Sequence, residues 1–242
     1  MPISVVVGGQ FGSEGKGKVA LDIAVRRSAV AVVRVGGTNS GHTAVWQGVT
    51  YAFRQLPASA LTPGAIVVLP AGSLIDIGIL TKEVAELGLT PERLKIDPKA
   101  SVISEADKAA EQSSGLIQAI GSTASGTGAA LCRRLGRADN CIGIEAAHHP
   151  ALAPYLADTN SILRNLLSAN GRVVIEGTQG FGLSVFHGGY YPKATSRDTT
   201  AGTFVGEAGL SPLDVDEVAL VIRTFPIRVA GDSGPRAMRG SW

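Results

Sequence analysis

Short apolar runs alternate with amphipathic segments along this chain, a pattern typical of strands joined by helices. Ser4–Val7 and Val30–Val35 have the composition of buried strands, and Lys16–Arg27 between them has helical spacing. A strand, a helix and a second strand in this order predict a parallel sheet with right-handed crossovers. The same reasoning predicts strands at Ile66–Leu69, Leu94–Ile96, Arg172–Glu176 and Thr224–Val229, helices at Ile75–Leu87, Glu105–Ile120 and Tyr155–Ala169, and a helix or strand at Asp214–Ile222.

The predicted fold class is therefore α/β, with a central, mainly parallel sheet flanked by helices. Within it, Ala44–Phe53 alternates apolar and polar residues around Gln47-Gly48, which predicts a β-hairpin insertion. Hydrophobic residues make up 45% of the chain and charged residues only 17%, and this balance suits a sheet that is buried on both faces.

The loop at residues 8–18, Gly-Gly-Gln-Phe-Gly-Ser-Glu-Gly-Lys-Gly-Lys, is a candidate phosphate-binding loop. Its glycines allow the close backbone approach that points N–H groups at an anion, and the helix that follows adds its dipole. The P-loop pattern would require glycine in place of Gln10 and a hydroxyl in place of Gly17. The loop therefore indicates a fold related to P-loop NTPases, and it disfavours an ordinary P-loop NTPase or switch.

Two further segments are rich in glycine, serine and threonine. The segment Gly121–Gly128 has the composition either of a flexible linker or of a second phosphate-facing loop, and composition alone leaves both open. Gly177–Gly202 is long for a loop inside a compact domain, and loops of that length are usually functional.

Charge and composition exclude several classes of function. The net charge is +2 and no lysine- or arginine-rich run occurs, so we expect neither nucleic-acid binding nor an electrostatic membrane anchor. No apolar run approaches the ~20 residues of a membrane helix and no signal peptide is visible, which predicts a cytoplasmic protein. Cys132 and Cys141 are expected to be free thiols rather than a disulfide or a metal pair.

Four segments taken together resemble the adenylosuccinate synthetase family, in family order and over essentially the whole chain. They are Gln10–Lys18 (QFGSEGKGK), Arg34–Thr43 (RVGGTNSGHT), Ile120–Gly128 (IGSTASGTG) and Glu176–Gly202 (EGTQG to DTTAG). The resemblance implies a ligase that joins L-aspartate to a purine 6-oxo nucleotide. In that reaction a nucleoside triphosphate first phosphorylates the 6-oxygen, and the aspartate amine then displaces the phosphate.

The resemblance also implies roles for particular residues. Catalysis would fall to Ser13, Lys16, His42 and Gln179, with His42 steadying the transferring γ-phosphoryl group. The triphosphate, ATP or GTP, would contact Gly12, Glu14, Gly15, Lys16, Gly17, Lys18, Gly41, His42 and Thr43. The acceptor monophosphate would contact Ser13, Asn39, Thr123, Arg137, Gln179 and Thr195, with Arg137 reaching over from the second subunit of a homodimer. Mg²⁺ would be the cofactor, held by Ser13 and the Gly41 carbonyl.

Position 13 departs from the typical family pattern. Most members carry an aspartate there, which removes the purine N1 proton and ligates Mg²⁺, whereas this chain has Ser13. One interpretation is an inactive copy. The other, which we favour, is a changed acceptor, because a small hydroxyl leaves room for the 2-amino group of guanine beside N1. Serine at this position resembles the phage and archaeal-type branch, in which the phage enzymes join aspartate to dGMP, so dGMP or GMP is favoured over IMP.

The C-terminal region also departs from the family. Members continue beyond the Gly234-Pro235 found here with an arginine-rich aspartate-binding loop and a pair that reads the triphosphate's base. We therefore expect a single domain over 1–242 that lacks the family's C-terminal part, either as a short natural form or as a sequence that omits it. The alternative function is an inactive or regulatory purine-nucleotide-binding protein of the same fold.

Overall fold

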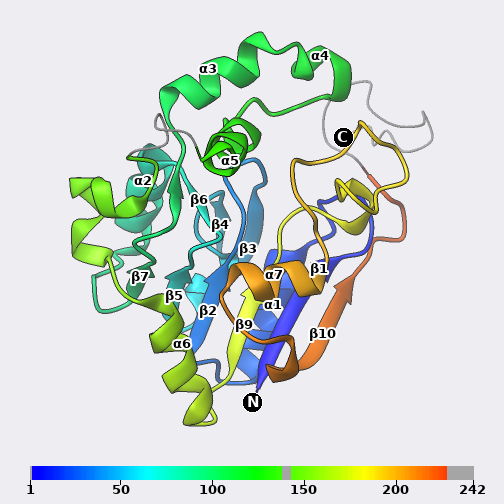
Figure 1. The fold of residues 1–242 in the computed structure, drawn as a ribbon. Coiled ribbons are helices and arrows are strands. Elements are labelled where there is room, and N and C mark those ends of the chain that lie inside the picture. The colour runs from blue at the N-terminus through cyan, green and yellow to red at the C-terminus, as the bar shows by residue number, and fades with distance from the viewer. Residues whose placement is uncertain (1, 138–142, 228–242) are drawn as a thin grey trace.

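The protein is built around an all-parallel sheet, whose strands are spread across Figure 1 from β10 at the right to β7 at the left. The computed structural model describes residues 2–137 and 143–227. Its six-stranded sheet has the order β10-β1-β9-β2-β5-β7, and every neighbouring pair is parallel. The strands are β1 (Ile3–Gly8), β2 (Ala31–Arg34), β5 (Ile66–Leu69), β7 (Leu94–Ile96), β9 (Val173–Glu176) and β10 (Val215–Val221). The predicted fold class is confirmed.

Helices cover both faces of this sheet. On one face α1 (Lys16–Arg26) and α2 (Ile77–Leu87) pack against alternate strand residues such as Val6 and Val32. On the other face α6 (Thr159–Ser168) and α7 (Ala201–Glu207) cover the remaining residues of the same strands. Burial on both faces explains why the strands are continuous apolar runs rather than alternating ones.

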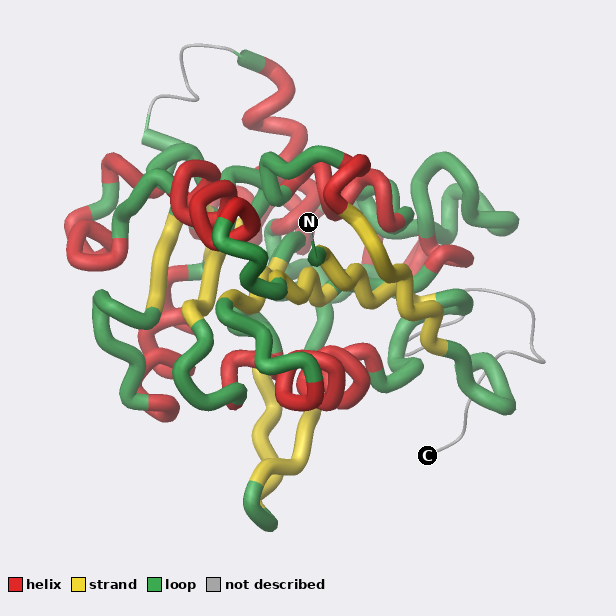
Figure 2. The backbone as a smooth tube through the Cα atoms, turned by 90° about the horizontal axis from the view of Figure 1, so that it is seen from below, coloured by secondary structure: helices red, strands yellow, loops and turns green. Residues whose placement is uncertain are grey.

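The remaining elements lie around the carboxyl ends of the strands or extend from the body. They are β3 (His42–Trp46), β4 (Val49–Phe53), β6 (Leu74–Ile75), β8 (Ser101–Val102), α3 (Glu105–Ser113), α4 (Leu116–Ile120) and α5 (Thr127–Gly136). The β3–β4 pair is the predicted hairpin, turning through Gln47 and Gly48 with φ angles of 50° and 81°, and Figure 2 shows it projecting from the body. Short 3₁₀ segments occur at Ala58–Leu61, Ala146–His148, Pro150–Tyr155, Phe181–Leu183 and Pro212–Asp214.

Three sequence expectations need correction, and one open alternative is resolved. The helix predicted over Glu105–Ile120 is divided into α3 and α4, because Gly115 adopts a left-handed φ of 74°. The helix predicted from Tyr155 begins only at Thr159, after the capping side chain of Asp158. Asp214–Ile222 is resolved as the strand β10, whereas residues 224–227 form no strand, and 228–229 lie outside the described residues.

Two helices, α5 and α7, lie where the apolar pattern gives no helix. Both contain two glycines, which lower intrinsic helix propensity, so tertiary packing rather than local sequence stabilises them. Cys132 on α5 is an exposed free thiol, and Cys141 lies outside the described residues. Among the residues that the structure describes, no helix has the length and apolar character that a membrane crossing requires.

The anchor of α7 provides a test of this packing. Phe204 is fully buried, and its ring lies against Gly177 at the end of β9. Replacing Phe204 by alanine should lower the free energy of unfolding by about 3–5 kcal/mol, because it leaves a cavity between α7 and the sheet. Phe186, which is 77% exposed, is the matched control, and its alanine variant should stay within about 0.5 kcal/mol in denaturant unfolding. Equal losses in the two variants would contradict this account of α7.

Candidate active site

A cavity of about 1010 Å³ opens at the carboxyl ends of the sheet strands. Its walls come from the loops after β1, β2 and β9 and from the segment that joins α3 to α5. Ligands of parallel α/β proteins bind at this edge of the sheet. Of the predicted site residues, the cavity is lined by Gly12, Ser13, Glu14, Gly15, Lys16, Gly17, Lys18, Asn39, Gly41, His42, Thr43, Thr123, Gln179 and Thr195. Arg137 is exposed at the end of α5 and does not line it.

The loop after β1 is held in shape by its own carboxylate. Glu14 accepts hydrogen bonds from the backbone N–H groups of Gln10 and Gly12 at 3.1 and 2.8 Å, and it pairs with Lys16 Nζ at 2.6 Å. Burial lowers the pKa of Lys16, and the neighbouring Glu14 carboxylate partly offsets this by favouring the charged form. The loop is thus preassembled around an internal ion pair, with Lys16 held at the cavity wall.

Gly17 explains one of the departures from the P-loop pattern. A Cβ atom at this position would lie 2.8 Å from the Cβ of Ala58 and 3.0 Å from the Cβ of His42. The hydroxyl residue of a P-loop would therefore collide with the hairpin and the 3₁₀ turn that follows it. The first turn of α1 packs closely against β3 only because position 17 has no side chain.

His42 belongs to a buried cluster that joins three elements. Arg34 ends β2 and Glu176 ends β9, and the two residues are directly paired in register. Glu176 Oε1 lies 2.5 Å from His42 Nδ1 and 3.4 Å from Arg34 Nη1, and Arg34 Nη1 lies 2.5 Å from His42 Nδ1 and 2.9 Å from His42 Nε2. Because the carboxylate of Glu176 can only accept, we assign the proton of the neutral imidazole to Nδ1, which leaves Nε2 as an acceptor for Arg34.

The charges in this cluster set its protonation state. Burial and the adjacent Arg34 guanidinium lower the pKa of His42 to about 4, against the favourable influence of Glu176. Burial alone would raise the pKa of Glu176, but the hydrogen bond from His42 and the charge of Arg34 lower it to about 2. At neutral pH the ligand-free site therefore holds a neutral histidine, a carboxylate and a guanidinium.

The opposite wall of the cavity carries neutral polar groups. Asn39 Nδ2 donates to Thr195 Oγ1 at 3.4 Å, and Gln179 Nε2 donates to the Asn39 carbonyl at 3.5 Å. Gln179 and Ser13 both have a left-handed φ of 58°, which is unusual for residues with a side chain and is typical of functional sites. These residues form the group expected at the acceptor end.

The segment Gly121–Gly128 lines the cavity and is anchored at its end, so it is not a free linker. The buried Glu111 carboxylate accepts from the N–H groups of Gly126, Gly128 and Ala129 at 2.8, 2.6 and 3.1 Å. This carboxylate occupies the N-terminal amides of α5 and fixes the loop that carries Thr123.

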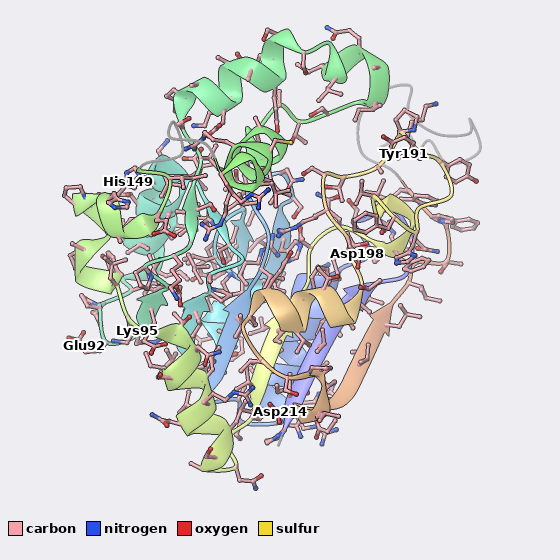
Figure 3. The ribbon with its side chains drawn as sticks, in the orientation of Figure 1. Glu92, Lys95, His149, Tyr191, Asp198 and Asp214 are labelled. Carbon is pink, nitrogen blue, oxygen red and sulfur yellow. The ribbon has the colours of Figure 1, made fainter. Side chains whose placement is uncertain are left out.

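The long loop 177–202 is ordered by one carboxylate just before α7. Figure 3 shows Asp198 above α7 and Tyr191 farther out on the same loop. Asp198 accepts from the hydroxyls of Ser184, Thr200 and Thr203 at 2.7, 2.5 and 2.5 Å. Burial would raise the pKa of Asp198, but these hydrogen bonds lower it to about 2. The loop predicted to be functional therefore has a fixed internal network.

The donor set for Mg²⁺ is sparse. The described residues contain no group of three or more histidine, cysteine, aspartate or glutamate side chains that could hold a metal ion. Ser13 and Gly41 line the cavity and can offer a hydroxyl and a carbonyl oxygen. Mg²⁺ accepts such neutral oxygens when substrate phosphates complete its shell, so the residues fit an ion that arrives with a nucleotide.

Sequence reasoning missed Glu111 and Arg223, which line the cavity, and Arg34 and Glu176, which contact the cavity residue His42 from behind it. A usable signal existed for two of them, since a charged residue at the end of an otherwise apolar buried strand requires a buried partner. Arg34 and Glu176 are such residues. Glu111 lies in an ordinary amphipathic helix and gives no local signal.

The fold and the cavity thus define an α/β protein with a preformed glycine-rich loop, a candidate for phosphate binding, at the carboxyl edge of its sheet. The family profile of adenylosuccinate synthetase matches residues 5–149 and 137–238. The adenylosuccinate synthetases of Pyrococcus horikoshii and Thermococcus onnurineus are 36% and 37% identical over 242 aligned positions, which cover 98% of this chain and 70% of each relative. The chain belongs to the adenylosuccinate synthetase family, whose members are ligases that form a C–N bond in purine nucleotide biosynthesis.

Solved structures agree with this assignment. One is the cyanophage S-2L succinoaminodeoxyadenylate synthetase (PurZ), bound to dGMP and to dATP as an energy donor. It is 28% identical with a TM-score of 0.84, and the match covers all of this chain and 68% of that one. The fully ligated adenylosuccinate synthetase of Plasmodium falciparum, 24% identical with a TM-score of 0.85 over 97% of this chain and 64% of its own, supports the fold.

The buried cluster predicts the titration of His42. In the free protein the His42 imidazole should stay neutral until the pH falls to about 4, whereas in the unfolded chain it protonates near 6.5. The contribution of His42 to stability is therefore complete above pH 6.5 and is lost as the pH falls toward 4. NMR titration of the imidazole resonances gives the value directly, with the exposed His187 as an internal comparison. A His42 that titrates at 6.5 or above would contradict the geometry described here.

Proposed function

We propose that this protein is a purine nucleotide–aspartate ligase whose favoured acceptor is a guanylate, dGMP or GMP. The observation that carries the proposal is Ser13, which lines the cavity where typical members place a catalytic aspartate. The 28% identity to a phage enzyme described with dGMP supports a guanylate. The archaeal relatives are adenylosuccinate synthetases with higher identity, so IMP remains the comparison substrate.

The triphosphate, ATP or GTP, would lie on the loop 12–18 and on Gly41, His42 and Thr43. Backbone N–H groups and the N-terminus of α1 would meet the phosphates, and Lys16 and the exposed Lys18 would neutralise them. His42 would contact the γ-phosphoryl group as it moves. In the free site His42 Nε2 faces the positive guanidinium of Arg34, which disfavours protonation of the imidazole. We expect the negative charge of the γ-phosphoryl group to favour the protonated imidazole when the triphosphate binds.

The acceptor would lie on the opposite wall. Asn39, Thr123 and Thr195 would hold its 5′-phosphate, and Gln179 would contact the purine at the 6-position. The purine 6-oxygen would attack the γ-phosphorus and release the nucleoside diphosphate, and the purine N1 proton would pass to water, since Ser13 offers no carboxylate to take it. The aspartate amine then attacks C6, loses a proton and expels the phosphate. Phosphoryl transfer of this kind depends chiefly on positioning and charge neutralisation, which the cavity walls supply.

Mg²⁺ would be held by the nucleotide phosphates together with the Ser13 hydroxyl and the Gly41 carbonyl. When bound, the ion supplies neutralisation of the charge that develops on the phosphates. Neither protein ligand is charged, so we expect weak binding of Mg²⁺ in the absence of nucleotide.

Phosphate release tests the ligase directly. The protein is mixed with Mg²⁺, aspartate, ATP or GTP, and IMP, GMP or dGMP in turn, and we expect release with a guanylate that depends on aspartate. Ser13→Asp should weaken guanylate binding roughly tenfold or more, because a carboxylate crowds the 2-amino group, and Ser13→Ala is the matched control. A wild type that prefers IMP, or a Ser13→Asp variant with unchanged preference, would contradict the guanylate proposal. Nucleotide binding without any turnover would instead favour the regulatory alternative.

The predicted homodimer rests on Arg137, which is exposed at the end of α5 and outside the cavity of its own chain. We propose that Arg137 reaches the acceptor phosphate in the partner's cavity. Mixing Arg137→Ala with Thr195→Val should restore part of the activity, because one intact site forms in the mixed dimer. Sedimentation that shows a monomer with acceptor bound would contradict this arrangement.

A further inference from the structure

Gln10 is the second residue that breaks the P-loop pattern, and its side chain pairs with the backbone beyond β10. Gln10 Nε2 donates to the Arg223 carbonyl at 3.0 Å, and Gln10 Oε1 accepts from the Arg223 N–H at 2.9 Å. Next to this pair, the Gly9 N–H donates to the Val221 carbonyl at 2.9 Å. A glycine at position 10 could make neither side-chain bond. The departure from the pattern therefore ties the phosphate-binding loop to a segment more than 200 residues away.

The same residue of that segment also reaches Ser13. Arg223 Nη1 donates to the Ser13 carbonyl at 3.1 Å, and Arg223 lines the same cavity as Ser13. Gln10, Arg223 and Ser13 thus form one chain of hydrogen bonds, which we call the bracket. It connects the end of β10 to the position that distinguishes this protein from typical family members.

Ser13 needs such support because its backbone conformation is unfavourable. Its φ of 58° is left-handed, a conformation that residues with a side chain rarely adopt. On the inner side of the turn, Glu14 holds the neighbouring Gly12 N–H. On the outer side, Arg223 Nη1 donates to the Ser13 carbonyl. Without this hydrogen bond, Ser13 can relax to an ordinary conformation, and its hydroxyl then changes direction.

We propose that Gln10 and Arg223 are positioning residues that set the direction of the Ser13 hydroxyl and thereby the choice of acceptor. The role rests on the proposed function of Ser13 and extends it to Gln10, at the start of the first family segment, and to Arg223, which lies outside all four segments. The triphosphate end of the loop has separate support from the Glu14–Lys16 pair and from α1. Loss of the bracket should therefore affect the acceptor and leave the triphosphate largely untouched.

Binding titrations of dGMP and of ATP without Mg²⁺, measured separately by calorimetry, test this separation, and Mg²⁺ is left out because Ser13 is also a proposed ligand of that ion. In Arg223→Met the dissociation constant for dGMP should rise about tenfold and that for ATP less than about threefold. Arg223→Lys should recover most of the loss, since an ammonium group can still donate to the Ser13 carbonyl. Arg26→Met is the matched control, because Arg26 is exposed on α1 and pairs with Asp22. A larger effect on ATP than on dGMP would overturn the proposal.

A double-mutant cycle separates positioning from a direct contact between Arg223 and the ligand. In a Ser13→Ala background no hydroxyl remains to be positioned, so Arg223→Met should change dGMP binding by no more than about twofold. The same tenfold loss in both backgrounds would show that Arg223 acts independently of Ser13, and the proposal would fail. Gln10→Ala should follow Arg223→Met in both backgrounds.

Hydrogen exchange of the free protein keeps the test independent of the proposed reaction. The Gly12 amide should exchange at least about tenfold faster in Arg223→Met than in wild type or Arg26→Met, since the turn loses its outer support. A wild type that binds no purine monophosphate would overturn the proposed function. Unchanged exchange at Gly12 would overturn the bracket itself, whatever the protein binds.

Discussion

Glu176 carries a charge with no exposure to solvent, and much of the site is arranged around it. Its carboxylate accepts from the N–H groups of Ala58 and Ser59 at 3.0 and 3.1 Å and from the Ser59 hydroxyl at 3.0 Å, besides its contacts with His42 and Arg34. A buried carboxylate is tolerated only when its oxygens are satisfied in this way, and removal of one partner of such a group typically costs about 3–5 kcal/mol. A single anion thus fixes the relative positions of strand β9, the hairpin, the 3₁₀ turn after it and the end of β2.

Two buried carboxylates, those of Glu14 and Glu111, fix the conformations of two loops that line the cavity. Glu14 draws Lys16 and the amides of its own loop inward, and Glu111 occupies the amides at the start of α5. Each gives a glycine-rich segment a fixed conformation that its composition would not maintain in water. The site is therefore organised before any substrate arrives, and binding energy is not consumed in ordering these loops.

The architecture and much of the cavity wall follow from sequence, and the exceptions have physical causes. Strands such as Ile66–Leu69 are readable because burial on both faces leaves an unbroken apolar run. The cavity wall could be predicted from the glycine motifs because each motif is one continuous run of residues. The α7 helix could not be predicted from sequence, because its low intrinsic helix propensity is overcome by the packing of Phe204 on the sheet. The contacts of Arg223 could not be predicted for another reason: its partners Gln10 and Ser13 lie more than 200 residues away in the sequence.

The position of β1 between β9 and β10 has a consequence for the order in which the molecule can form. β1 is the first strand of the described chain, yet its neighbours begin at residues 173 and 215. On a ribosome that adds about 5–20 residues per second, the segment for β1 leaves the exit tunnel roughly 10–40 s before the segment for β10 is made. During that interval both edges of β1 are unpaired, and the loop that follows it cannot take its final form. Contacts of such long range slow folding, so the nucleotide-binding end of the molecule cannot be completed before β10 is made, although its first loop is encoded near the start.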